Sequence, residues 1–249
     1  MKKQKDYLKQ QIKMTITSAL MRISYDNAKK ILKKYNIEFE ENIIKVKKNF
    51  ENSYSEEFKK TSLVGNSIDI YQKAIEFQDY NLFLPEDGSF FQFSIDGRNI
   101  RFAYFERPYN TMTYPEFLKS LDMSYEEYGD EFYEDYNQYL IESPQKEHIT
   151  NFRYDYSEVE YSEVIHPVSH LHIGQNNNVR IPLSKILLPS SFVMFIIKQV
   201  YWEKFKNYSQ NNISFIDDYI SEINKVKEIP KEYLTSRELK ELILSLNGR

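Results

Sequence analysis

The fold is decided by a stretch in the middle of the chain, residues 89–105, which reads SFFQFSIDGRNIRFAYF. Two runs rich in aromatic and β-branched residues flank the dipeptide Asp96-Gly97. Such a pair is a strong signal for a β-hairpin, because glycine accepts the positive φ that a tight turn requires. The sequence therefore predicts two antiparallel strands, at residues 89–95 and 99–105.

Further strand patterns follow this hairpin, and helical patterns surround it. Apolar residues predict strands at 149–156, 168–173 and, after a tight turn, 179–181. Apolar residues at helical spacing predict helices at 4–21, 24–35, 67–77, 190–206 and 214–226. Ser24 or Asp26 can cap the second of these. Helices around one antiparallel sheet are typical of the α+β class. We therefore expect a central antiparallel sheet packed against several helices, with helical N- and C-terminal regions.

The chain is long enough to bury a substantial core, and it contains neither an internal repeat nor a flexible linker. We therefore expect a single α+β domain over residues 1–249. Residues 1–80 could instead form a helical N-terminal subdomain.

The composition excludes several chemistries. The absence of cysteine excludes disulfides, thiolate metal sites and a cysteine nucleophile. With only 6 glycines, the chain has neither a GxGxxG nor a Walker phosphate loop. No apolar run reaches the roughly 18 residues that a membrane helix needs. We therefore expect a cytoplasmic protein without a membrane partner.

Charge is distributed unevenly along the chain. Residues 1–60 carry 15 basic and 8 acidic residues, whereas residues 114–163 carry 3 basic and 14 acidic ones. A basic segment favours a nucleic-acid partner, because lysine and arginine release counterions from phosphates. The acidic, Tyr-rich residues 114–163 could bind a basic protein partner. Both segments can also be read as the solvated faces of amphipathic helices.

Three of the four histidines lie close together in the sequence, at His166, His170 and His172, and the fourth is His148. On a strand, His170 and His172 project to the same face. If the neighbouring strands pair, Arg153 and Arg180 would flank the histidines. His148 stands alone, and we expect it to be structural.

This combination of side chains suits metal-independent cleavage of RNA. Two histidines can act as general base and general acid, while arginine stabilises the charge of a phosphoryl group. The candidate catalytic residues are His166, His170 and His172, and the candidate substrate-binding residues are Arg153, Arg180 and Tyr154. No cofactor is expected for this reaction.

Two other interpretations of the histidines remain open. With Asp155 or Glu163, the residues His166, His170 and His172 could hold Zn²⁺ or Fe²⁺. Alternatively, the rings could be packing residues that bond to backbone carbonyl groups.

Several segments also match a known pattern: Phe152 to Asp155, His166 to Gly174 with the spacing HPxxHLHIG, Arg180-Ile181-Pro182, and Leu188-Pro189 at the start of an apolar helix. Together with DGSFFQF at residues 87–93, they resemble the bacterial family known as domain of unknown function 2290, over about residues 80–205. That resemblance implies no established activity.

The segment is also similar, more weakly, to small toxins of the TumE type, in which a strand with an arginine precedes a proline- and histidine-rich segment. This similarity rests on Arg153, His166, His170 and His172, and it implies a toxin or phage-defence setting with RNA as the substrate. The leading hypothesis is a cytoplasmic bacterial protein that binds nucleic acid and can cleave it by histidine acid/base catalysis. The alternatives are a metal-dependent enzyme with a three-histidine site, and a non-enzymatic interaction module that uses residues 114–163.

Overall fold

The computed structural model describes residues 16–47, 50–51, 54–110, 112, 114–174 and 179–240. Its centre is a seven-stranded sheet in the order β1-β2-β3-β4-β5-β6-β7, in which every neighbouring pair is antiparallel. The strands are β1 (Glu40–Glu41), β2 (Leu82–Phe83), β3 (Phe90–Asp96), β4 (Asn99–Phe105), β5 (Phe152–Tyr156), β6 (Ser169–Ile173) and β7 (Ile181–Pro182). The predicted α+β class and the strands of the hairpin are confirmed.

The tight turn at Asp96-Gly97 sets the register of the hairpin. Asp96 pairs with Asn99, and Gly97 between them has a φ of 61°. This positive φ is the conformation that the Asp-Gly pattern predicts. It places Phe93 opposite Phe102 and Ser94 opposite Arg101.

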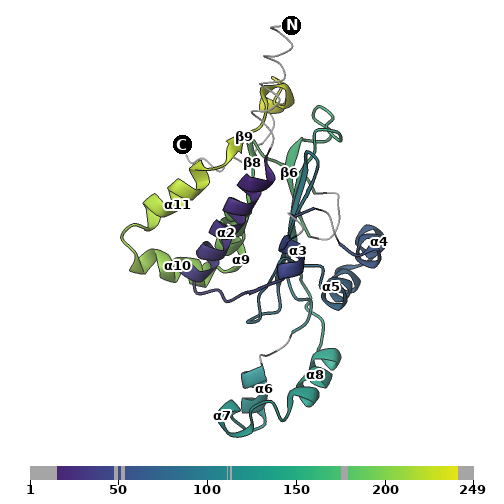
Figure 1. Ribbon diagram of the computed structural model, residues 1–249, viewed down its shortest axis with the longest axis vertical. Helices are drawn as coiled ribbons and strands as arrows, with labels where there is room; N and C mark the ends of the chain where they lie inside the picture. The colour runs from purple at the N-terminus through teal and green to yellow at the C-terminus, as the bar shows by residue number, and fades with distance from the viewer. Residues whose placement is uncertain are drawn as a thin grey trace.

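One face of the sheet is the main core. Because side chains alternate along a strand, Phe91, Phe93, Phe102 and Tyr154 all point to this face. The helices α2 (Ser18–Lys34) and α9 (Pro189–Val200) cover it, and α10 (Trp202–Asn211) and α11 (Phe215–Asn224) lie beyond them (Figure 1). Aromatic rings fill the contact, with Phe192 of α9 against Phe91, Phe93 and Phe102.

The opposite face is apolar only in part. Phe90 and Phe105 stack there, under α4 (Glu56–Val64) and α5 (Ser67–Glu76) (Figure 1). Further along the same face the strands carry Ser94, Arg101 and Asp155, which are polar. The two faces of one sheet therefore have different chemistry.

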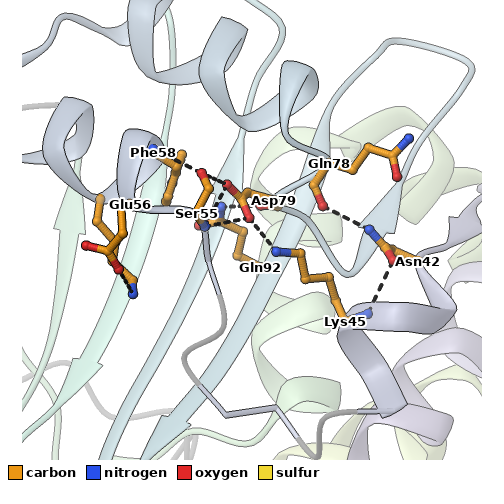
Figure 2. A network of polar contacts seen from close by, with 9 residues as sticks. Asn42, Lys45, Ser55, Glu56, Phe58, Gln78, Asp79 and Gln92 are labelled. Atoms are coloured by element: carbon orange, nitrogen blue, oxygen red, sulfur yellow. Dashed lines mark hydrogen bonds and ion pairs between the residues drawn. The ribbon is translucent and has the colours of Figure 1, made fainter.

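A buried carboxylate holds the helices of the second face in place. Asp79 accepts hydrogen bonds from the amide and hydroxyl of Ser55, the residue that caps α4, and forms an ion pair with Lys45 of α3 (Ile43–Lys47) (Figure 2). Its backbone carbonyl accepts from the side chain of Gln92 on β3. With these partners in place, the burial of Asp79 is compensated.

The acidic residues after β4 form a separate small unit. The helices α6 (Tyr114–Ser120), α7 (Tyr125–Tyr128) and α8 (Tyr133–Glu142) extend away from the sheet (Figure 1) and share a cluster of Tyr114, Leu118 and Tyr136. Gly129, at a φ of 53°, ends α7, so the tyrosines of this unit lie on separate short helices. The proposed role of residues 114–163 in binding a protein stays a prediction.

Two helix predictions need correction. The helices expected at 4–21 and 24–35 are one helix from Ser18 onward, capped by Thr17, and residues 1–15 lie outside the described residues. Ser24 does not cap a helix; its hydroxyl oxygen accepts from the backbone N–H of Ser190 at 3.0 Å and so joins α2 to α9.

The helix expected at 190–206 is divided at Tyr201, whose ψ of 45° leaves the helical region. There the Tyr201 hydroxyl donates to Asp87 at 2.7 Å. This change of direction brings Phe205 of α10 against Tyr35, at the end of α2.

Two short strands, β8 (Lys185–Ile186) and β9 (Lys227–Glu228), and the 3-10 turns η1 (Lys231–Tyr233) and η2 (Glu238–Lys240) complete the described chain. The helices before residue 80 lie on both faces of the sheet, so they do not pack as one helical unit. The organisation into a single domain stays a prediction. Among the described residues, no helix is long and apolar enough to cross a membrane.

Candidate functional site

The register of three strands brings the candidate residues together. Arg101 on β4 lies opposite Asp155 on β5, and Asp155 lies opposite His170 on β6. One step along, Arg153 lies opposite His172. All five belong to the polar part of the second face, and with His166 they form what we call the Arg–Asp–His cluster.

Asp155 lies at the centre of this cluster. Its Oδ1 accepts from Nε of Arg101 at 2.7 Å, and its Oδ2 accepts from Nε of Arg153 at 2.7 Å. Nε2 of His172 lies 3.3 Å from the same Oδ2. Burial alone would raise the pKa of Asp155, but the contacts with His172, Arg101 and Arg153 outweigh it and hold the pKa far below its usual range. The carboxylate is therefore charged at neutral pH.

His170 is held in one protonation state and one tautomer. Its Nδ1 lies 2.8 Å from the carbonyl oxygen of Pro167, and a carbonyl can only accept, so Nδ1 carries the proton. Burial lowers the pKa of His170 to about 4. The ring is therefore neutral at pH 7, with a lone pair on Nε2.

Two ring nitrogens of the cluster have no partner. Nδ1 of His172 and Nδ1 of His166 are buried without a hydrogen bond in the described part of the molecule. The three rings touch in sequence, because the ring centroid of His170 lies 4.9 Å from that of His166 and 4.8 Å from that of His172. Unsatisfied buried polar atoms are rare in native proteins and often mark functional sites.

The arginines and the histidines differ in their access to solvent. His170 and His172 are 1% and 2% exposed. The side chains of Arg101 and Arg153 are 59% and 28% exposed, and that of His166 is 21% exposed. The cluster therefore presents guanidinium groups and one imidazole to solvent, and keeps the other two imidazoles behind them.

The remaining predicted residues lie in different places. Arg180 is exposed, and its positive charge, after burial and that of Arg101, contributes to lowering the pKa of Arg153. Tyr154 lies on the opposite face, fully buried, where its hydroxyl contacts Ser169 Oγ at 3.1 Å and accepts from the amide of Leu187. Side chains alternate along β5, so Tyr154 points to the core while Arg153 and Asp155 point to the opposite face. Tyr154 is therefore not part of the site. His148 is exposed in the segment before β5.

Arg101 is the residue that the sequence interpretation did not single out. It stands between Ile100 and Phe102, which both point into the core. A charged residue between two core positions of a strand points to the other face, and this alternation could have placed Arg101 on the polar face.

A cavity of about 130 Å³ opens beside the cluster. Its walls come from β3, β4, β5 and the segment after β5: Ser94, Asp96, Asn99, Ile100, Arg101, Asp155, Tyr156, Ser157 and Glu160. Arg101 and Asp155 belong both to this cavity and to the cluster.

Part of the cluster could instead bind a metal ion. Asp155, His170 and His172 each offer a ligand atom, and these atoms lie within 4.8 Å of one another. Carboxylate and imidazole together are ligands for zinc and iron. His166, the third histidine of the predicted metal site, is not part of this group.

The antiparallel sheet is aromatic on one face. On the other face it carries a buried Asp–His–His group joined to two arginines. This combination defines an α+β protein with a candidate charged site. The model of a family described as an uncharacterized conserved protein (DUF2290) matches residues 31–245, and the chain belongs to this family. The match extends beyond the residues 80–205 that carried the resemblance. No curated protein and no solved structure matches the chain.

Proposed function

We propose that this protein binds the phosphodiester backbone of RNA at the Arg–Asp–His cluster and cleaves it by histidine acid/base chemistry. The observation that carries the proposal is that Arg101 and Arg153 share one carboxylate. With His170 neutral, two guanidinium groups and one carboxylate leave a net positive charge in this hydrogen-bonded group. A phosphate oxygen would compensate it.

The guanidinium groups are also suitably oriented for an anion. Each uses Nε on Asp155, and no contact of their terminal nitrogens appears among the described residues. Terminal guanidinium nitrogens form the planar fork that holds a phosphate through two hydrogen bonds. Asp155 acts in this proposal as a positioning residue, because it accepts from Nε of both arginines and so fixes their orientation. Arg180 adds positive charge nearby.

The two unpartnered ring nitrogens support the cleavage step. A general base takes the proton of the ribose 2′-hydroxyl, and the resulting oxygen attacks phosphorus. The bond from phosphorus to the 5′ oxygen breaks, and a general acid gives that oxygen a proton. The products are a 2′,3′-cyclic phosphate and a 5′-hydroxyl end. Nδ1 of His166 and Nδ1 of His172 are the atoms that such a substrate would supply with partners. His170 lies between the two rings, and we propose that it orients them.

This step needs a substrate to reach buried atoms. His166 belongs to the connection between β5 and β6, and it is the most exposed ring of the cluster. We therefore propose that RNA contacts His166 first and that the connection moves when His172 is reached.

The test uses matched oligonucleotides: one 12-mer of RNA, the same sequence as DNA, and the RNA with a single 2′-deoxy nucleotide. We expect cleavage of the RNA in the presence of EDTA, with no cleavage at the 2′-deoxy position. H166A and H172A should abolish cleavage, whereas H148A, a change at an exposed histidine, should retain it. Absence of cleavage by the wild type contradicts the acid/base part of the proposal. So does cleavage by H166A and H172A at the rate of the wild type.

The metal alternative rests on the proximity of Asp155, His170 and His172. We favour phosphate because both oxygens of Asp155 already accept from guanidinium groups, and a divalent cation beside them would be repelled by the two guanidinium charges. Dialysis against Zn²⁺, followed by dialysis against metal-free buffer, distinguishes a metal site from a phosphate site. Retention of one zinc per chain by the wild type but not by H170A would favour the metal enzyme.

A further inference from the structure

We infer that the cavity beside Arg101 receives the hydrogen-bond-donating edge of a guanine base, an inference that rests on the proposed function and names its substrate more closely. The cavity of about 130 Å³ shares Arg101 and Asp155 with the Arg–Asp–His cluster. A nucleotide whose phosphate lies on the guanidinium groups therefore has its base within reach of this cavity.

The size of the cavity suits one flat ring. A cavity of about 150 Å³ holds one benzene molecule, so this space can take the edge of a base but not a whole nucleotide. Ser94 and Ser157 contribute hydroxyls to the lining, whereas Ile100 and Tyr156 belong to the core cluster on the opposite side of the sheet and line the cavity with their backbone.

Apart from Arg101, the charged groups that line the cavity are carboxylates, which accept hydrogen bonds. Asp96 and Glu160 are two of its walls, and neither forms an ion pair with lysine or arginine within the described ranges. Oε2 of Glu160 lies 3.9 Å from Nε2 of His166. Arg98 pairs with Glu158, and Nε of Arg101 pairs with Asp155. Oδ1 of Asn99, which also lines the cavity, is buried and has no hydrogen-bond partner in the part of the chain that the structure describes.

Guanine is the base that matches such a wall. A carboxylate offers two acceptor oxygens side by side. On its Watson–Crick edge, guanine presents two adjacent donors, N1–H and the N2 amino group, which can pair with both oxygens. Adenine, cytosine and uracil each place an acceptor next to their donor on that edge, and this acceptor would face a carboxylate oxygen. The negative charge of Glu160 also lies near the guanidinium of Arg101, whose pKa it helps to raise. Base and phosphate can thus be held on either side of Arg101.

The experiment measures nucleotide binding to the full chain by calorimetry. The probes are the 3′-monophosphates of guanosine, inosine and adenosine, and ribose 5-phosphate as a probe without a base. Inosine lacks only the N2 amino group. We expect guanosine 3′-monophosphate to bind about tenfold more tightly than the other two nucleotides, because one charge-assisted hydrogen bond is lost with inosine.

The double variant D96N/E160Q tests the wall directly. It should remove the preference for guanine and leave the affinity for ribose 5-phosphate within twofold. The control E126Q/E127Q removes the same charge from two exposed residues of α7 and should keep the preference.

The outcomes separate this inference from the proposed function. Equal affinity for the three nucleotides, a preference for adenosine, or an unchanged preference in D96N/E160Q overturns the guanine site and leaves phosphate binding standing. Failure of the wild type to bind any of the four probes overturns both.

Discussion

The two faces of the sheet are built from the same strands by the same alternation of side chains, but they differ in how their polar groups are satisfied. On the core face, the Tyr154 hydroxyl both donates and accepts. Because Ser169 Oγ donates to the carbonyl of Lys185, the Tyr154 hydroxyl donates to Ser169, and it accepts from the amide of Leu187. On the other face, Nδ1 of His166 and Nδ1 of His172 lack hydrogen-bond partners among the described residues, and two arginines share one carboxylate.

In the proposed function, the core face is the scaffold and the polar face is the binding site. Fully bonded polar groups among aromatic rings stabilise one arrangement and offer nothing to a ligand. Unsatisfied nitrogens and excess positive charge cost free energy in the folded state, and a ligand that supplies an anion recovers it. The predictions below contrast the two faces, from the largest effect to the smallest.

The largest effect should come from the core face. Phe192 is fully buried and contacts the rings of Phe91, Phe93 and Phe102. Replacing it with alanine removes this burial and leaves a cavity. Urea unfolding of F192A should therefore show a loss of about 4 kcal/mol in the free energy of unfolding. A loss below about 1 kcal/mol would mean that the two layers are not packed as described.

The next effect should come from the centre of the polar face. In Asp155→Asn the amide cannot neutralise Arg101 and Arg153, so two guanidinium groups lose their shared anion. We expect the free energy of unfolding to fall by about 3 kcal/mol. This value is at the lower end of what breaking a buried ion pair costs, because Arg101 is partly exposed. Added phosphate should recover part of it. E158Q alters the pair with Arg98, whose side chain is half exposed, and its amide oxygen can still accept from the Tyr156 hydroxyl. It serves as the control and should cost less than about 1 kcal/mol.

The pH dependence of stability should report His170. Its pKa is about 4 in the folded chain and about 6.5 in the unfolded chain, so between these values the unfolded state binds more protons. Stability is therefore complete above about pH 6.5 and falls by at most about 3 kcal/mol as the pH drops to 4. H170N keeps an N–H for the carbonyl of Pro167 but cannot titrate, so its stability should fall less over this window. Urea unfolding at pH 7, 6 and 5 measures the slopes, with H148N as the control at an exposed histidine. Equal slopes in wild type and H170N would contradict the assignment of a neutral His170.

The smallest effect should come from Tyr154→Phe. Removing a hydroxyl that is fully bonded in the core leaves the amide of Leu187 without its acceptor and should cost about 1–2 kcal/mol. RNA binding should stay within twofold of the wild type, since the side chain lies on the core face. A larger loss of binding at unchanged stability would return Tyr154 to the site, where the sequence interpretation had placed it.

The elements that could be predicted from the sequence are those determined by neighbouring residues. The hairpin was predicted because Asp96-Gly97 determines its own turn, and α5 because its apolar spacing is regular. The division of the long apolar helix at Tyr201 could not be predicted, because it depends on a hydroxyl that bonds to Asp87, which is distant in sequence. The same holds for Ser24, which resembled a helix cap and instead bonds to Ser190.

The site followed the same rule. The parity of one strand placed His170 and His172 on one face, and the structure agrees with this. Arg101 lay outside the interpretation because only the pairing of β4 with β5 brings it to Asp155. Tyr154 was included because it stands between Arg153 and Asp155 in sequence, although this position sends it to the opposite face.

The central claim is that the exposed guanidinium of Arg101 holds a phosphate of RNA, and one binding measurement tests it most directly. Fluorescence anisotropy with a labelled single-stranded RNA 12-mer compares the wild type with R101Q and with R98Q, a nearby exposed arginine on the same hairpin that pairs with Glu158. The account predicts that R101Q weakens binding about tenfold or more, as the loss of charge-assisted hydrogen bonds requires, and that R98Q changes it less than twofold. Equal weakening by the two variants, or no binding by the wild type, would contradict it.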